Sequence, residues 1–256
     1  MRAAVTTEQH GFDVIEITDP TPGPDELVIR VVACGVCGSD IKAQPFMPAG
    51  MVMGHEFGGE IVAVGSNADG WREGTNVAVM PVVSCGSCQY CTAGFVSHCA
   101  QARYIGMGPD GGGFAEFAVV PARHAFALPD EMTNTYAALV EPFAVGLHGV
   151  HGAQLSPGED VLVVGAGGVG LTTIAWARAK GARRITAVDP DPNGASRPLS
   201  WVQAMRKPRL RTPTLMTWHW NVLGVRNFYR HARRPCARKG ASSSPVRPPS
   251  QPPSNP

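Results

Sequence analysis

The sequence predicts a protein of mixed architecture, α/β with β, in which a β-rich domain precedes a parallel α/β unit. Short apolar runs separated by turn residues fill the chain up to about residue 150. A strand, a glycine turn, a helix and a second strand then follow over residues 160–189. Beyond residue 193 the composition becomes basic and rich in proline. We therefore divide the chain into residues 1–150, 151–193 and 194–256.

Four apolar runs mark the strands that we expect in the first domain. They occupy residues 27–32, 61–64, 77–83 and 114–120. Each is rich in β-branched and small residues and is bounded by turn formers, which favours strands over helices. The density of turns predicts a compact, partly barrel-like β domain. Residues 133–150, rich in Ala, Leu and Val, suit a helix that Pro142 bends or starts.

The α/β unit is predicted from a change of pattern after residue 159. Residues 160–164 form a short apolar strand, and a glycine turn follows at 165–170. An Ala-rich helix over 169–180 is closed by Gly181, and a second strand over 184–188 ends in Asp189. This order opens a parallel α/β sheet.

Composition excludes several classes of protein. With 256 residues, 44% of them hydrophobic and only 16% charged, the chain is neither a coiled coil nor wholly disordered. No apolar run reaches the roughly 18 residues of a membrane helix, and residues 1–11 lack the apolar core of a signal peptide. We expect a cytoplasmic protein that binds neither membrane nor nucleic acid.

Four of the seven cysteines form a C-x2-C-x2-C-x7-C run, at Cys85, Cys88, Cys91 and Cys99. Thiolates at this spacing can converge tetrahedrally on one zinc ion. Disulfides fit less well, because cysteines two residues apart bridge poorly and nothing else suggests secretion. An iron–sulfur cluster is the other alternative, but the proline that follows the fourth cysteine of a ferredoxin run is missing. We predict a structural zinc lobe over residues 85–99.

A second set of metal-binding side chains is spread more widely along the chain. Cys37, the pair His55 and Glu56, and Glu141 offer one thiolate, one imidazole and carboxylates. Such a set can hold a catalytic zinc that keeps one coordination position open. Taken singly, Cys37 also fits a buried thiol and Glu141 a solvated charge at a helix start. The glycine turn downstream favours the catalytic interpretation.

The glycine turn has the spacing of a dinucleotide-binding loop. Gly165 permits a tight turn, Gly167 lets the backbone approach a pyrophosphate, and Gly170 allows close packing of helix on strand. Asp189 stands at a strand end, where a carboxylate accepts hydrogen bonds from ribose hydroxyls and repels a 2′-phosphate. This favours NAD over NADP. A glycine-rich turn in an unrelated α/β domain is the alternative.

Five motifs in order give the chain a resemblance to a known family. They are Gly-Val-Cys-Gly-Ser-Asp at 35–40, Gly-His-Glu-x-x-Gly at 54–59, the four-cysteine lobe, Glu-Pro-Phe-Ala-Val-Gly-Leu-His at 141–148 and Gly-Ala-Gly-Gly-Val-Gly at 165–170. Over residues 1–193 the chain resembles the zinc-dependent medium-chain alcohol dehydrogenases. Its Glu-Pro pair is similar to that of the sorbitol, butanediol and threonine dehydrogenase branch. The resemblance implies a GroES-like β-barrel domain followed by a Rossmann domain.

The same resemblance implies an activity and a set of site residues. The activity is the oxidation of a secondary alcohol or polyol by NAD, with two zinc ions per chain; the alternative is an inactive zinc-binding fragment. Cys37, His55 and Glu141 would hold the catalytic zinc, with Glu56 beside it as an exchangeable ligand. Asp40 would orient His55, and Ser39 would take the substrate's hydroxyl proton. The residues expected at the cofactor are Gly165, Gly167, Gly168, Val169, Gly170 and Asp189.

Two further expectations come from the family. Its members are usually homo-oligomers, although a shortened chain need not be one. Many relatives carry a histidine three residues after the serine of the proton relay, and here that position is Lys42. The outer part of the relay would then use water or this lysine.

The last 63 residues depart from the family pattern. Residues 194–256 hold 12 Lys and Arg and no acidic residue, whereas residues 1–193 hold 10 basic and 20 acidic residues. A displaced reading frame joins the third base of each codon to the first two bases of the next. In this frame the codons for residues 216–221 can encode only Asp, Ala, Leu and Glu at four positions, within a stretch that resembles a later Rossmann strand. We infer a shift of reading frame just after Asn193, an incomplete Rossmann domain and a mostly disordered tail. A natural basic tail is the alternative.

Overall fold

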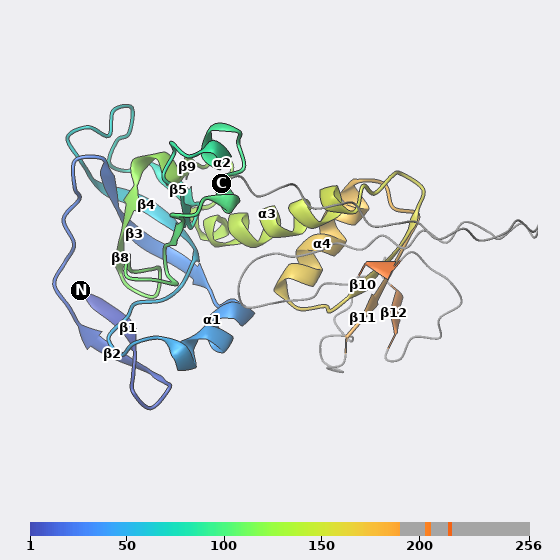
Figure 1. Ribbon diagram of the computed structural model, residues 1–256, viewed down its shortest axis with the longest axis horizontal. Helices are drawn as coiled ribbons and strands as arrows, with labels where there is room; N and C mark the ends of the chain where they lie inside the picture. The colour runs from blue at the N-terminus through green and yellow to red at the C-terminus, as the bar shows by residue number, and fades with distance from the viewer. Residues whose placement is uncertain (190–202, 206–214, 217–256) are drawn as a thin grey trace, which may run out of the picture.

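The computed structural model describes residues 1–189, 203–205 and 215–216. The described residues form a β-rich part and a smaller α/β part. These two parts lie at opposite ends of the molecule, and one long helix runs between them (Figure 1). Among the described helices, none has both the length and the apolar character needed to cross a bilayer.

A five-stranded antiparallel sheet forms the centre of the β-rich part. Its strands, in spatial order, are β8 (Phe117–Pro121), β3 (Glu26–Gly35), β4 (Glu56–Val64), β5 (Asn76–Val79) and β9 (Ala125–Ala127). The side chains of Leu27, Ile29, Phe57, Ile61 and Val77 are at most 1% exposed and form the core of this domain. The sheet therefore supplies a rigid support for the segments that leave its strand ends.

Two smaller sheets flank the central one. A hairpin of β1 (Arg2–Thr6) and β2 (Phe12–Glu16) makes single bridges from Ala3 to Ala115 and from Val5 to Val52, in the segments that precede β8 and β4. The other is a short pair, β6 (Val82–Val83) with β7 (Arg103–Tyr104), beside the four cysteines.

Each of the four predicted runs contains strand residues, but the observed limits of the strands differ from the predicted ones. The runs at 27–32 and 61–64 lie inside β3 and β4. The run at 77–83 divides into β5 and β6, because Pro81 has no N–H to donate to a ladder. The run at 114–120 begins as a strand only at Phe117. The hairpin β1–β2 was not predicted, since β2 is exposed along its whole length and shows no apolar run.

Helix α3 (Ala137–Gly152) is the long helix between the two parts (Figure 1). It continues through Pro142, so the proline neither starts the helix nor ends it. The predicted helix over 133–150 is thus confirmed with later limits. At its beginning α3 touches β4, where a side chain on Gly58 would clash with Ala137.

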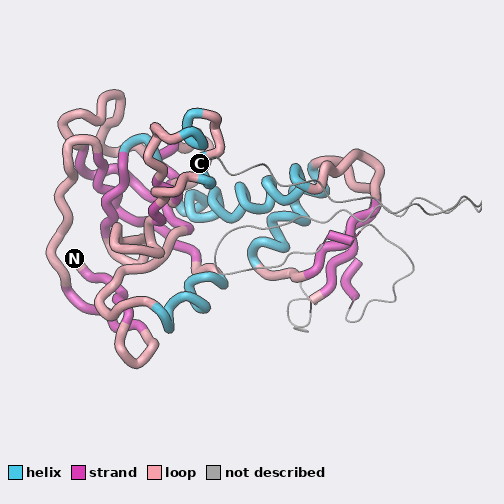
Figure 2. Tube along the Cα trace, in the orientation of Figure 1, coloured by secondary structure: helices cyan, strands magenta, loops and turns pink. Residues whose placement is uncertain are grey.

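The α/β part follows the predicted order. Strand β10 (Asp160–Val164) and strand β11 (Arg184–Val188) are parallel, and helix α4 (Gly168–Ala179) lies between them in sequence. Figure 2 shows α3 and α4 together between the strands of the two parts. Val163, Ile174 and Ala177 are at most 1% exposed within the core of the α/β part.

Two short strands complete the described sheet. They are β12 (Gln203–Met205) and β13 (Leu215–Met216), which pair in parallel with β11 and β10. The resulting order, β12-β11-β10-β13, is that of the first strands of a dinucleotide-binding fold. The expected shift of reading frame after Asn193 and most of the expected tail lie outside the described residues.

Candidate functional site

A cluster of Cys37, His55 and Glu56 lies where β3 ends and β4 begins. Gly35 of β3 pairs with Glu56 of β4, so the antiparallel ladder brings the flanking segments together. Cys37 precedes the short helix α1 (Gly38–Ala43). One ligand atom from each of the three side chains lies within 4.8 Å of the other two. All three side chains are nearly buried, and together they form a compact thiol, imidazole and carboxylate set.

Asp40 connects two members of this cluster. Its Oδ2 accepts a hydrogen bond from the backbone N–H of Cys37 at 2.8 Å, and its Oδ1 lies 3.1 Å from Nδ1 of His55. Burial disfavours the charged imidazole, but the hydrogen bonds with Asp40 and Cys37 outweigh it and raise the pKa of His55 to about 10. These hydrogen bonds favour the protonated imidazole, whereas an imidazole that binds a metal must be neutral.

Ser39 lies on the opposite side of the imidazole. Its Oγ is 3.5 Å from Nε2 of His55, the ring nitrogen that does not face Asp40. Lys42 stands in the last turn of α1. The contact places the Ser39 hydroxyl beside Nε2 of His55, the nitrogen that would bind a metal. The expected proton relay needs a hydroxyl at this position. The roles of both residues in proton transfer stay predictions.

Glu141 is near the cluster but does not belong to its closest set. It lies on α3, and its carboxylate is not one of the ligand atoms gathered within 4.8 Å. Burial raises the pKa of Glu141 to about 7; the charge of His55 lowers this pKa, and the charges of Glu56 and Asp40 raise it. Glu141 is therefore electrostatically coupled to the cluster, and its place as a metal ligand stays a prediction.

The four cysteines of the second cluster lie on a lobe around helix α2 (Gln89–Thr92) (Figure 1). Their sulfur atoms all lie within 4.8 Å of one another, and the Cys88 and Cys85 sulfurs are 3.4 and 3.8 Å from that of Cys91. A tetrahedral zinc site places its sulfurs about 3.8 Å apart, given Zn–S bonds of about 2.3 Å. All four are free thiols. The set therefore fits zinc.

The thiols of this lobe differ in pKa, because backbone N–H groups donate hydrogen bonds to some of them and burial dominates at others. Hydrogen bonds from the backbone of Ser87 and Cys88 lower the pKa of Cys85 to about 6. A backbone hydrogen bond at Cys91 lowers that of Cys88, while burial raises the pKa of Cys91 to about 11. The thiolate form is therefore favoured at Cys85 and disfavoured at Cys91.

The glycine turn connects β10 to α4 as predicted. Gly165 has a φ of +98°, which favours glycine, and a side chain on Gly170 would clash with the carbonyl of Gly165. Among the described residues, a Cβ on Gly167 or Gly168 would meet no atom within 4 Å. The start of α4 therefore has open space in front of it, where an anion would meet the positive end of the helix.

Asp189 closes the turn from the end of β11. Its Oδ2 accepts a hydrogen bond from the backbone N–H of Ala166 at 2.6 Å. The carboxylate therefore lies beside the turn, as the dinucleotide interpretation requires. Val169 follows Gly168 in the first turn of α4.

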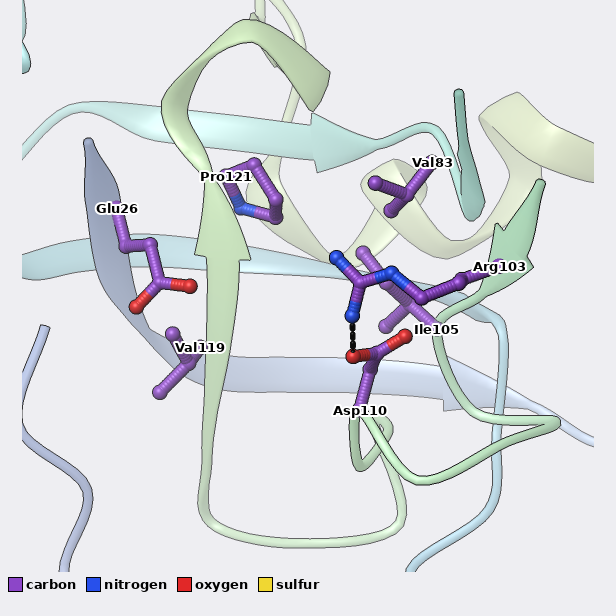
Figure 3. Close-up of a pocket in the computed structure, with 7 residues that line it drawn as sticks. All are labelled: Glu26, Val83, Arg103, Ile105, Asp110, Val119 and Pro121. Atoms are coloured by element: carbon purple, nitrogen blue, oxygen red, sulfur yellow. Dashed lines mark hydrogen bonds and ion pairs between the residues drawn. The ribbon is translucent and has the colours of Figure 1, made fainter. Parts of the chain in front are cut away.

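A cavity of about 60 Å³ lies elsewhere in the β-rich part (Figure 3). Arg103 and Asp110 form an ion pair at its wall, and Glu26 and Val119 line the opposite side. It contains none of the metal-binding side chains and no residue of the glycine turn. This cavity is therefore separate from the candidate site.

Comparison with known proteins places the chain in a family. The family model described as "Alcohol dehydrogenase GroES-like domain" matches residues 23–130. L-galactonate-5-dehydrogenase of Escherichia coli K12 is 44% identical over 173 residues, 66% of this chain and 50% of that protein. The chain belongs to the zinc-dependent medium-chain alcohol dehydrogenase family.

Other members of the alcohol dehydrogenase family match at similar levels. Sorbitol dehydrogenase of Bacillus subtilis is 35% identical over 204 residues, 75% of this chain and 56% of that protein. A zinc-binding dehydrogenase of Sinorhizobium meliloti, solved with NADP bound, is 32% identical with a TM-score of 0.73, and the match covers 79% of this chain and 60% of that one. The chain thus spans about half the length of these curated relatives.

Proposed function

We propose that the chain is a zinc-dependent oxidoreductase that transfers hydride from a secondary alcohol or polyol to NAD. The observation that carries this proposal is the cluster of Cys37, His55 and Glu56, with His55 held by the buried Asp40. A metal-binding histidine whose other ring N–H donates a hydrogen bond to a carboxylate is the usual arrangement at catalytic metal sites. Relatives named as dehydrogenases of sorbitol and L-galactonate support a polyol or a related hydroxy compound as the substrate.

The donor atoms of the first cluster fit a catalytic zinc. We propose Cys37, His55 and Glu141 as its ligands, with Glu56 as an exchangeable fourth. Bound zinc would supply a Lewis acid that lowers the pKa of an alcohol, and bound NAD would supply the hydride acceptor. Ser39 would accept the hydroxyl proton, and Asp40 would hold the imidazole in one orientation. The four-cysteine lobe would hold the second zinc for structure alone, since its four thiols leave no open position.

The cofactor residues we propose are Gly165, Gly167, Gly168, Val169, Gly170 and Asp189. The open space before Gly167 and the helix start at Gly168 suit a pyrophosphate. The carboxylate of Asp189 beside Ala166 suits the ribose of NAD and disfavours the 2′-phosphate of NADP. Because eight expected ligands include five thiols that must stay reduced, we propose the cytoplasm as the compartment.

A combined measurement of metal and turnover tests the proposal. Purified chain is assayed for zinc content and for formation of NADH from sorbitol and from butanediol. We expect two zinc ions per chain and steady NADH formation that the Cys37→Ser variant lacks. Two zinc ions without turnover, in wild-type chain that is well folded, would instead identify an inactive zinc-binding fragment.

A further inference from the structure

Helices α3 and α4 contact each other closely just after Glu141. Figures 1 and 2 show the two helices beside one another between the sheets. A Cβ on Gly146 would lie only 2.5 Å from Oγ1 of Thr172 and 2.9 Å from the backbone N of Thr173. The absence of a side chain at Gly146 therefore lets the backbones of α3 and α4 approach each other.

Two side chains of α4 donate hydrogen bonds to the residues that follow Glu141. Oγ1 of Thr172 donates to the carbonyl of Pro142 at 3.0 Å, in a buried contact, and Nε1 of Trp176 donates to the carbonyl of Phe143 at 2.8 Å. The rings of Phe143 and Trp176 also pack edge to face, with their centroids 6.3 Å apart. These contacts fix the position of α3 next to a proposed zinc ligand.

Thr172 also contacts the first turn of its own helix. Its Oγ1 lies 2.9 Å from the carbonyl of Val169, in the first turn of α4. A threonine hydroxyl carries one proton, so it donates fully to only one of these two carbonyls at a time. Thr172 is 6% exposed, and water does not readily replace the lost bond. The hydroxyl therefore shares one proton between two acceptors, one in the first turn of α4 and one in α3.

The other end of α3 is fixed to the strand that carries Glu56. Ala137 packs against Gly58 of β4 so closely that a side chain on Gly58 would clash with it. Glu141 thus lies between two tight contacts, one with β4 and one with α4. A change at the second contact is carried to Glu141 by a helix rather than lost in a flexible loop.

We propose that Thr172 is a positioning residue that couples occupancy of the dinucleotide turn to the geometry of the metal cluster. A pyrophosphate that binds the N–H groups at the start of α4 shifts this turn and with it the carbonyl of Val169, which favours the hydrogen bond from Thr172 to the carbonyl of Pro142. This bond fixes α3, and with it Glu141, in its position near the cluster. Trp176 supports the same contact through Phe143. The inference rests on the proposed function, because it needs zinc at the cluster and NAD at the turn.

Coupling of this kind has a measurable form. The affinity for zinc at the Cys37 site should rise when NAD is saturating, and the two effects must be reciprocal. Coupling between sites typically amounts to a factor of about 5 or more. The zinc affinity of the weaker site is measured by competition with a chromogenic chelator, with and without NAD. The Cys37→Ser variant identifies which site is being measured.

Three variants isolate the role of the hydroxyl. In Thr172→Val, which keeps the shape and removes the donor, we expect the coupling factor to fall to about 1. In Thr172→Ser, which restores the donor, we expect the wild-type factor. The matched control is Thr173→Val: Oγ1 of Thr173 donates to the same carbonyl of Val169 at 2.8 Å and is fully buried, but no bond from it to α3 is present among the described residues. This control should keep the wild-type factor.

The possible results separate the inference from the proposed function. Equal coupling factors in wild-type and Thr172→Val overturn the inference, as does a loss shared equally by Thr173→Val, which would indicate a purely structural effect. Wild-type chain that binds only one zinc ion, or no NAD, overturns the proposed function and the inference with it. If circular dichroism shows that Thr172→Val does not fold, Trp176→Phe removes the neighbouring donor and must lower the factor; an unchanged factor there overturns the inference.

Discussion

Oδ1 of Asp40 lies 3.1 Å from Nδ1 of His55. The other oxygen of the same carboxylate accepts the backbone N–H of Cys37, so one buried side chain fixes two proposed zinc ligands. Because Asp40 is only 1% exposed, solvent does not compete for these bonds. The distance between Cys37 and His55 is therefore set before any metal binds, which lowers the entropic cost of assembling the site.

Replacing this carboxylate should weaken the metal site without unfolding the protein. For Asp40→Asn we expect a loss of roughly 10- to 100-fold in zinc affinity at the Cys37 site, since residues that orient a metal ligand contribute about that much. Competition with a chelator measures the loss. The exposed Asp69→Asn change makes the same chemical substitution far from the cluster and serves as the control. An unchanged affinity in Asp40→Asn would show that Asp40 does not orient His55 for zinc.

The two cysteine clusters should lose their metals independently. We expect Cys37→Ser to lower the zinc content from about two ions per chain to one, with the fold intact, since Cys37 lies at a strand end outside the sheet core. Cys85→Ser should also lose one ion, but with a drop in solubility, because the metal would hold the turns of the lobe together. Metal analysis of both variants decides this. Unchanged zinc content in Cys37→Ser would contradict the proposed catalytic site.

The thiols of the metal-free lobe should differ in reactivity with pH. The pKa of Cys85 is lowered to about 6 and that of Cys91 is raised to about 11. Since the thiolate is the nucleophile, alkylation of Cys85 by iodoacetamide should be nearly maximal at pH 7.5 and fall as the pH drops below about 6. Cys91 should react only slowly at pH 7.5. Mass spectrometry of chelator-treated protein gives the order in which the cysteines are alkylated.

Two controls apply to this measurement. Added zinc should protect all four lobe cysteines. Cys34, whose pKa burial raises to about 12, should remain unmodified throughout. Equal rates at Cys85 and Cys91 would contradict the assignment of the thiolate to Cys85.

The sequence was most informative where function constrains the spacing of residues. The strands Asp160–Val164 and Arg184–Val188 have exactly the predicted limits, because a glycine turn and an acidic residue bound them. The close approach of Cys37 to His55 and Glu56 was expected from the resemblance of their motifs to those of a known family. No local pattern of apolar and polar residues predicts it. The ladder that brings them together pairs Gly35 with Glu56, across 20 residues of intervening chain.

Other features depend on contacts that a linear pattern does not contain. Strand β2 is exposed along its length, and it is held by pairing with β1 and by the edge-to-face contact of Phe12 with Phe114, so neither alternation nor an apolar run marks it. Thr172 reads as an ordinary helical residue. Its bond to Pro142 exists because two helices 30 residues apart cross at Gly146. Neither signal is present before the chain is folded.

Two glycines of the turn should respond to alanine in opposite ways. A Cβ at Gly167 would meet no atom of the described part of the chain within 4 Å, whereas one at Gly170 would clash with the carbonyl of Gly165. We therefore expect Gly167→Ala to leave the midpoint of thermal unfolding nearly unchanged and to weaken NAD binding about tenfold or more, since the methyl group occupies the space proposed for the pyrophosphate. Gly170→Ala should lower the unfolding midpoint itself. Calorimetry and a binding titration distinguish them, and a normal NAD affinity in Gly167→Ala would place the pyrophosphate elsewhere.

Asp189 should decide between NAD and NADP through its charge. Its Oδ2 holds the N–H of Ala166, so the carboxylate is kept at the turn, where it meets either two ribose hydroxyls or a 2′-phosphate. Hydrogen bonds to a charged group contribute about 1.5–3 kcal/mol, so we expect wild-type chain to bind NAD more tightly than NADP by roughly 10- to 100-fold. The variant Asp189→Asn keeps an oxygen that can accept from Ala166 and removes only the charge. It should bind NADP more tightly than wild type does while its unfolding midpoint stays the same. Asp189→Ala removes both, and should also loosen the turn and lower that midpoint. If Asp189→Asn retains the full preference for NAD, repulsion by this carboxylate is not its source, and the choice of cofactor must be made by other residues.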